Sequence, residues 1–372
     1  MFAVVVGIFG LSGCGTHSAT GTAGNGDSAA NASAPQDGGA TDAATDGATS
    51  GADLSIIVTG PRTWSQLLAY TDALHAMKYV GGFVYAVDSA ADSVEVWNAS
   101  THAHVTTIPV GHVPGDLATD GTYLYVANML AREFGDDYLS VIDPASQTVI
   151  ATSQVTELDW GNDPDNDPVT NFPTNVTVLG HEIYVVFPAN AVPGLIPVAV
   201  GSLDEDTYQA AGSAPANLAG IGDLLVITNL KALGNFTDDD IRIQRTDGTL
   251  LQTLETGGKL HDAITIEDRV WVAHAPLSAP GDLLVIDPTT GDIEHVATAA
   301  GTYGLASSGG LIYVTCTDAA RVQTFDTKTH TLVEDVDLAA VAPMVVNARG
   351  ISAAPNGDIY LESDGMISLL SH

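Results

Sequence analysis

Positive charge is scarce in this sequence: 11 Lys and Arg face 45 Asp and Glu among 372 residues, a net charge of −34. Such a surface repels phosphate backbones and anionic lipid, which argues against nucleic-acid binding and against electrostatic docking on a membrane. The only cysteines are Cys14 and Cys316, so a disulfide framework is excluded. Hydrolase elbows, His-Glu-x-x-His pairs, Walker loops, dinucleotide fingerprints and haem-attachment motifs are all missing.

The N-terminus has the pattern of an export signal. Residues 2–11 form an apolar run that is too short to span a bilayer as a helix but has the length of a signal-peptide core. The run leads into Leu11-Ser12-Gly13-Cys14, which resembles a bacterial lipobox. In lipoproteins of this kind the chain is cleaved before the cysteine, which is then acylated. The resemblance implies a signal peptide at 1–13 and a palmitate-type anchor on Cys14.

The residues around this motif refine the expected location. Gly15, rather than Asp, follows the cysteine, and in similar lipoproteins this favours the outer membrane, with the protein facing the periplasm or the cell surface. A signal peptide normally begins with Lys or Arg, but none precedes Arg62. We therefore expect that the true start lies upstream or that the N-terminus is clipped.

The next segment, 14–53, is rich in Gly, Ala, Ser, Thr and Asp and contains no aromatic residue. A chain with nothing to bury does not form a core, so we expect a disordered tether behind the lipidated cysteine. Residues 54–372 are different, because short β-branched and aromatic runs recur there between turn-forming clusters. Only the stretch 64–74 has a helical period.

Seven similar units follow one another in 54–372. A short strand pattern such as Leu124-Tyr125-Val126-Ala127 recurs with its second position at 85, 125, 184, 225, 271, 313 and 360. Periods of about 40–50 residues with several short strands per unit predict an all-β, seven-bladed β-propeller of four-stranded antiparallel blades. We expect the Tyr, Trp or Leu at this second position to pack between blades, and Cys316, in an apolar run, to be a buried inert thiol.

The repeats also resemble a known family. The segments GTYLYVANM…DDYLSVIDPASQTVIAT and GLIYVTCTDAARVQTFDTKTHTLV look like YVTN-type β-propeller repeats. The last unit has three strands before the chain ends, so its fourth strand has to come from elsewhere. We expect an N-terminal strand at about 54–58 to supply it, which closes the ring and hides the free edges.

The candidate site is the mouth of the central channel, where the innermost strands begin. Aligning these starts gives one contribution per blade: His75, Asp116, Asn175, Asn217, His261 with Asp262, Tyr303 and Arg349. Asp116, Asn175 and Asn217 each follow a proline by two residues. Their oxygens suit a hard cation such as Ca²⁺, whereas His75 and His261 suit Cu or Zn. Polar residues also line any water-filled channel, so the alternative that these residues form no ligand or metal site stays open.

A second candidate metal site is the acidic insertion in the unit that spans 59 residues. The EF-hand order is absent, but the insertion offers carboxylate and amide oxygens for Ca²⁺. The candidate ligands are Asp159, Asn162, Asp163, Asp165 and Asp167. A solvated loop is the competing interpretation.

Three functions remain open from the sequence. The first is a monomeric, lipid-anchored propeller that binds a protein or a small molecule. The second is a lactonase-like hydrolase that uses a divalent cation in the channel, as the resemblance to gluconolactonase propellers implies. That family also uses a channel glutamate, and no Glu occurs at the start of an innermost strand here. The third is binding of Cu or Zn by the channel histidines.

Overall fold

The computed structural model describes residues 61–69, 74–129, 139–153, 173–187, 194–200, 203, 209–212, 214–229, 239–276, 280–363 and 366–372. The chain divides into two units, 1–48 and 49–372, and every described residue belongs to the second. Within the described residues, no helix is long and apolar enough to cross a membrane.

The described strands form seven antiparallel sheets of four strands, and in six of them the strands follow chain order. Blade 1 contains β2 (Leu74–Val80), β3 (Phe83–Asp88), β4 (Ser93–Asn98) and β5 (His104–Pro109). Blade 2 contains β6 (Pro114–Thr119), β7 (Leu124–Asn128), β8 (Leu139–Asp143) and β9 (Thr148–Ser153). Blade 3 contains β10 (Asn175–Leu179), β11 (Glu182–Phe187), β12 (Gly194–Ala199) and β13 (Gln209–Ala210).

The next three blades repeat the same meander. Blade 4 contains β14 (Pro215–Ile221), β15 (Leu224–Asn229), β16 (Asp240–Arg245) and β17 (Leu250–Glu255). Blade 5 contains β18 (Lys259–Ile266), β19 (Arg269–Ala275), β20 (Asp282–Ile286) and β21 (Ile293–Ala297). Blade 6 contains β22 (Thr302–Ser308), β23 (Leu311–Cys316), β24 (Arg321–Asp326) and β25 (Leu332–Asp337), followed by the short helix α3 (Leu338–Val341).

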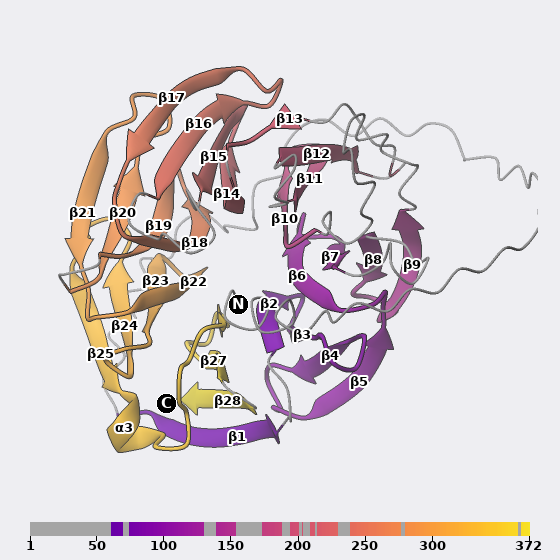
Figure 1. Ribbon diagram of the computed structural model, residues 1–372. Helices are drawn as coiled ribbons and strands as arrows, with labels where there is room; N and C mark the ends of the chain where they lie inside the picture. Colours follow the sequence, from indigo (N-terminus) through magenta and orange to yellow (C-terminus); the bar gives the residue numbers. More distant parts are fainter. Residues whose placement is uncertain are drawn as a thin grey trace, which may run out of the picture. The chain divides into compact units, whose positions relative to one another are not determined.

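Blade 7 joins the two ends of the described chain. Its inner strands are β26 (Ile351–Ala353), β27 (Ile359–Ser363) and β28 (Met366–Ser371), and its outer strand is β1 (Thr63–Ala69). Figure 1 shows β1 in indigo beside the yellow β28. Closure by an N-terminal strand is therefore confirmed, but the strand is 63–69. The predicted 54–58 lies outside the described residues, and within the stretch with a helical period, residues 64–69 belong to the strand β1 and pair with β28 instead.

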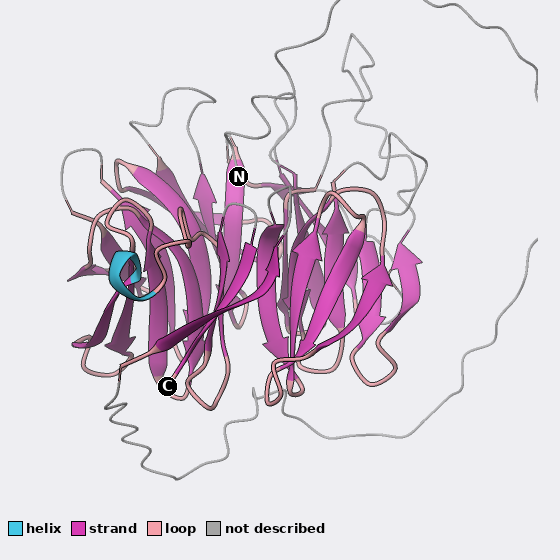
Figure 2. Ribbon diagram, turned by 90° about the horizontal axis from the view of Figure 1, so that it is seen from below, coloured by secondary structure: helices cyan, strands magenta, loops and turns pink. Residues whose placement is uncertain are grey.

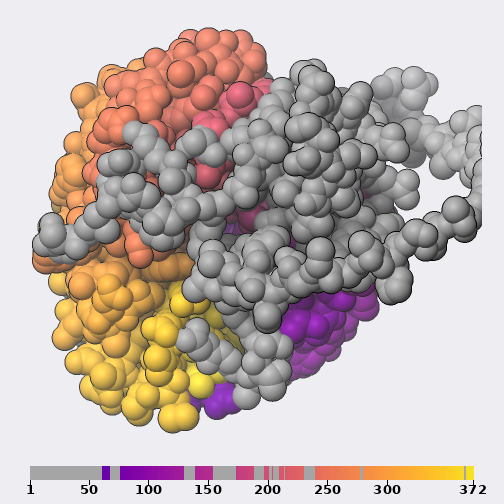
Figure 3. All heavy atoms as spheres, viewed as in Figure 1, coloured from indigo at the N-terminus to yellow at the C-terminus, as the bar shows by residue number. Residues whose placement is uncertain are grey.

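The first strands of the seven blades are neighbours in the cyclic order β2, β6, β10, β14, β18, β22, β26 and back to β2. The blades thus surround a central axis, as the sequence of colours around Figure 3 also shows. The protein is a seven-bladed β-propeller. Figure 2 shows strands running between the two faces of the ring.

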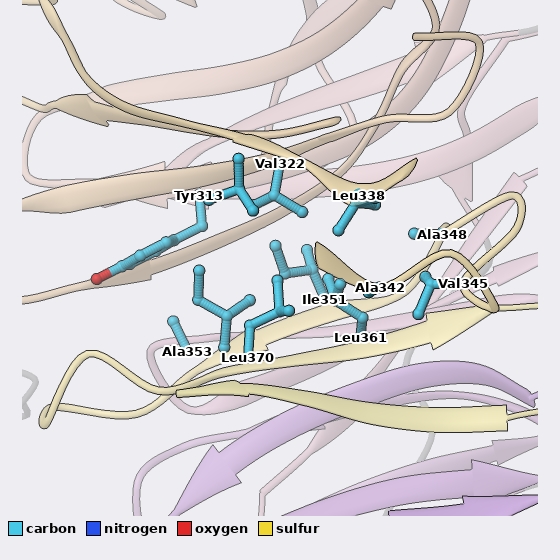
Figure 4. Packing of buried hydrophobic residues seen from close by; sticks show 12 residues of the cluster. Tyr313, Val322, Leu338, Ala342, Val345, Ala348, Ile351, Ala353, Leu361 and Leu370 are labelled. Carbon is cyan, nitrogen blue, oxygen red and sulfur yellow. The ribbon is translucent and has the colours of Figure 1, made fainter. Parts of the chain in front are cut away.

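The hydrophobic core consists of seven clusters, each between two neighbouring blades. Figure 4 shows the cluster between blades 6 and 7, where Tyr313 and Val322 face Ile351 and Leu361. The second-strand residues Tyr85, Tyr125, Tyr184, Leu225, Trp271, Tyr313 and Tyr360 are all buried, as predicted. Cys316 is also buried, and burial raises the pKa of its thiol to about 12, which keeps it protonated and unreactive.

Many acidic residues stabilise turns. Where the third strand of a blade turns into the fourth, Asp143, Asp287 and Asp326 each accept backbone N–H groups two or three residues further on, and Asn98 does the same. These backbone hydrogen bonds lower the pKa values of the three carboxyls. Part of the acidity of the chain is therefore structural, because the repeated turn favours Asp or Asn at this position.

Arg62 holds the start of β1 in the ring. Its guanidinium binds both carboxylate oxygens of Glu334 in blade 6 at 2.8 Å. It also donates to the carbonyls of Gly357 and Leu370 in blade 7. The Arg62 side chain is only 2% exposed, so these four contacts replace nearly all of its hydration.

We predict that Arg62→Met lowers the free energy of unfolding by about 2–4 kcal/mol, because it leaves Glu334 and two carbonyls without their donor. Urea unfolding followed by tryptophan fluorescence measures this loss. Arg245→Met is the matched control, since the ion pair of Arg245 with Asp223 is on the surface and its loss costs about 1 kcal/mol or less. Equal losses in the two variants would contradict a closing role for Arg62.

Candidate functional site

The innermost strands carry a repeated irregularity at their start. In blades 1, 2, 4, 5 and 6 the pairing of the first strand with the second shifts there, which is the mark of a β-bulge. A bulge inserts unpaired residues and changes the direction of the side chains around it. The predicted residues lie in or directly after these bulges, at His75, Asp116, Asn217, His261, Asp262 and Tyr303.

Two of these residues connect one blade to the next. Asp116 of blade 2 accepts the backbone N–H of Val176 in blade 3 at 3.0 Å. Asp262 of blade 5 accepts the backbone N–H of Leu305 in blade 6 at 2.9 Å. The two bonds are equivalent, because each joins the first strand of a blade to the first strand of its neighbour. Both carboxylates therefore have a structural role.

An amide chain continues the connection across blades 3, 4 and 5. The Asn175 side chain donates to Asp116 at 2.7 Å and to Asn217 at 3.3 Å. Asn217 in turn donates to the backbone carbonyl of His261. Asp116, Asn175 and Asn217 thus lie together, as their common register predicts. These bonds use Asp116 Oδ2, the Asn175 amide nitrogen and both polar atoms of the Asn217 amide, whereas Asn175 Oδ1 is buried without a hydrogen-bond partner among the described residues.

An aromatic stack forms the next part of the channel wall. The rings of His261 and Tyr303 lie 4.2 Å apart at 24°, and the Arg349 guanidinium is 5.9 Å from the centre of the Tyr303 ring. Burial, with the positive charges of Lys259 and Arg349, lowers the pKa of His261 to about 3. His261 is therefore neutral at physiological pH. Burial raises the pKa of Tyr303, so its phenol stays protonated.

Seven of the eight predicted channel residues have described side chains, and all seven are partly exposed although they lie inside the ring. Water therefore reaches this wall. His75 belongs to β2, but its side chain is not among the described ones. The acidic insertion with Asp159, Asn162, Asp163, Asp165 and Asp167 lies outside the described residues altogether.

Two charged residues of the channel were missed from the sequence. The charge of Lys78, in β2, acts on both Asp116 and Asp262 and lowers the pKa of each, against the larger effect of burial. Glu362, at the end of β27, raises the pKa of Tyr303 and accepts the backbone N–H of Gly350 at 3.1 Å. Neither lies at the start of an innermost strand, so aligning those starts could not find them.

The described residues contain no group of three or more His, Cys, Asp or Glu side chains that could hold a metal ion. The strongest cluster of titratable groups outside the channel is in blade 5, where Asp282 accepts from His274 and His295 at 2.6 Å each. The other ring nitrogen of His274 faces the carbonyl of Gly257. Because both partners of His274 are acceptors, its imidazolium form satisfies them best, which agrees with the raised pKa of His274.

No protein-family model matches the sequence, and no curated protein matches it. The fold resembles many solved propellers. Streptogramin B lyase is 13% identical, covers 83% of this chain and 97% of its own, and gives a TM-score of 0.61. The propeller domain of Myceliophteria thermophila Cps50 (Swd1) is 10% identical, with 84% and 100% covered and a TM-score of 0.61. PorZ of Porphyromonas gingivalis is 12% identical, with 83% and 38% covered and a TM-score of 0.54. At these identities the likeness establishes the fold alone.

The blade connection through Asp116 leads to a prediction with a pH dependence. Burial raises the pKa of Asp116 from 3.8 to about 6, so ionisation of this group costs stability in the folded state. Its contribution is largest below the unfolded pKa and is lost as the pH rises through about 6. Asp116→Asn removes this dependence, so wild type should gain stability relative to the variant when the pH falls from 7.5 to 5.

Urea unfolding of both proteins at the two pH values measures the difference. Asp116→Ala serves as the comparison at pH 7.5, where we expect a loss of about 1–3 kcal/mol because the Val176 N–H and the Asn175 amide lose their acceptor. A stability of Asp116→Ala equal to that of Asp116→Asn would show that the blade connection contributes nothing.

Proposed function

We propose that this protein is a binding protein of the cell envelope whose propeller holds a small polar ligand in its central channel. One observation carries the proposal: blades 2, 4, 5 and 6 place polar and aromatic side chains at bulges around the channel, and these side chains remain accessible to water. If the residues that line the channel served only to connect the blades, the stacked pair His261 and Tyr303 beside Arg349 would not be needed.

The residues of the channel divide into two roles. Asp116 and Asp262 are used on backbone N–H groups of the next blade, so they position the strands. Lys78 and Arg349 bring positive charge, and His261 with Tyr303 brings a flat surface. In a protein of net charge −34, two of only 11 basic residues in one channel indicate selection for an anionic or strongly polar ligand. A ligand that carries a planar group, such as a carboxylate beside a ring, fits this combination of positive charge and flat surface.

A thermal-shift screen of small polar metabolites tests the binding site. We expect carboxylate-bearing ligands to raise the melting temperature of the full-length protein and to lose this effect in Arg349→Ala and Lys78→Met. The surface variant Arg245→Ala controls for the loss of one positive charge and should respond as wild type does. Ligand effects that persist in both channel variants would overturn the proposal.

The anchoring to the envelope rests on the lipobox-like Leu11-Ser12-Gly13-Cys14 and on the tether-like composition up to residue 53. One structural neighbour, PorZ, is described as a bacterial surface component, which agrees with such a location. We propose that Cys14 carries the lipid. In a bacterial host, labelled palmitate should enter the wild-type protein, and Cys14→Ser should abolish both the label and the sedimentation with membranes. Labelling of the serine variant would contradict the assignment.

The two metal-dependent alternatives make a different prediction. Elemental mass spectrometry of protein purified without chelator, with melts in the presence and absence of EDTA, separates them from simple ligand binding. Near-stoichiometric Ca²⁺ with a chelator-sensitive melt would favour the hydrolase and justify a lactone screen. Bound Cu or Zn would favour transition-metal binding by the channel histidines. The blade-connecting bonds of Asp116 and Asp262 lead us to expect no tightly bound metal in the channel.

A further inference from the structure

A groove lies between blades 5 and 6, at the ends of the innermost strands opposite to the bulges. It has a volume of about 510 Å³ and is bordered by the turn between β18 and β19 and by the outer turns of both blades. Its apolar lining consists of Ile266, Trp271, Val285 and Ile293. Trp271 is buried, and His330 meets its ring edge-on with the centres 5.0 Å apart. The size is that of a typical ligand or peptide site.

The rim of the groove is acidic. Five carboxylates border it, against Arg269, Lys328 and His330. Asp268 and Asp287 bind Arg269, and Glu294 binds His330. The remaining two acids, Glu267 and Asp292, have no ion-pair partner within the described part of the chain. The groove therefore combines an apolar floor with uncompensated negative charge.

Glu267 occupies a turn position at which four other blades have glycine. The two-residue turn between the first and second strands has its first residue at positive φ in five blades. Four of them have glycine there, at Gly81, Gly180, Gly222 and Gly309, with φ of 59°, 62°, 60° and 60°. Only blade 5, within these five, has a larger residue, Glu267 at 54°. A left-handed conformation is unfavourable for a residue with a Cβ, so blade 5 accepts strain that a glycine would relieve.

We propose that this groove binds an extended segment of a partner protein in which a basic side chain stands next to an apolar one. The apolar side chain would lie against Ile266 and Ile293, the two partly exposed apolar residues of the lining, and the basic group would meet Glu267 and Asp292. Charge complementarity excludes two other occupants. The chain's own residues 1–60 contain Asp27, Asp37, Asp42, Asp46 and Asp53 but no Lys or Arg, and a second copy has the same net charge of −34.

Panning of a phage-displayed library of random 12-residue peptides against the full-length Cys14→Ser protein tests the proposal. We expect enrichment of peptides with Arg or Lys beside Leu, Ile or an aromatic residue. A synthetic peptide of the enriched sequence should bind more weakly as the salt concentration rises, because the rim charges are exposed. In Glu267→Gln combined with Asp292→Asn, its Kd should rise about five-fold.

Glu267→Gly is the decisive variant, because the proposal predicts opposite effects on stability and on binding. The melting temperature should rise by about 1–2 °C as the turn relaxes, while the peptide affinity falls. Asp318→Asn, an equal change of charge in an exposed turn of blade 6 at the other face, should leave the affinity unchanged. The proposal is overturned if no peptide is enriched, if enriched peptides lack basic residues, or if Glu267→Gly binds the peptide as wild type does.

Discussion

Closure of the ring is the constraint on which every interface of this propeller depends, because each blade is stabilised only by its two neighbours. The outer strand β1 contributes to two interfaces at once: Trp64 packs against the cluster between blades 6 and 7, and Leu67 against the cluster between blades 7 and 1. Arg62 fixes the entry of this strand through Glu334, a residue 272 positions away. Loss of the closure would expose two apolar faces and two strand edges together.

The same requirement explains the inner surface of the ring. First strands of neighbouring blades cannot pair as a sheet, so side chains join them instead: Asp116 and Asp262 each accept an N–H from the next blade. The bulges make this possible, because they turn the side chain away from its own sheet. A position that connects blades and a position at which we propose that a ligand binds are therefore adjacent along one strand. In blade 5 they are consecutive, as Asp262 connects and His261 stacks on Tyr303.

Much of the fold could be predicted from the sequence because the repeated second strand is almost wholly apolar and its aligned position, an aromatic in six blades and Leu225 in blade 4, is buried in every blade. The same search for apolar runs points to the wrong residues for the closing strand. The apolar run at 54–58 looks like a strand, whereas β1 mixes Thr, Ser and Gln with Trp and Leu because an outer strand is half exposed. In the channel, register alone brought Asp116, Asn175 and Asn217 together. Lys78 and Glu362 enter it from other registers, and only the three-dimensional ring reveals them.

Repetition also makes departures from the repeat informative. Asn98 and Asp326 recur at the same position of their turns because the turn geometry needs a side-chain oxygen there as hydrogen-bond acceptor. A change between Asn and Asp at this position therefore needs no functional explanation. Glu267 differs, because it adopts a left-handed conformation at a turn position where four other blades have glycine. This conformation is unfavourable for folding in a residue with a Cβ. Glu267 also adds negative charge to the groove, which agrees with our proposal that the groove binds a basic segment. Within one chain, the other blades thus serve as the internal comparison by which structural and functional acids are told apart.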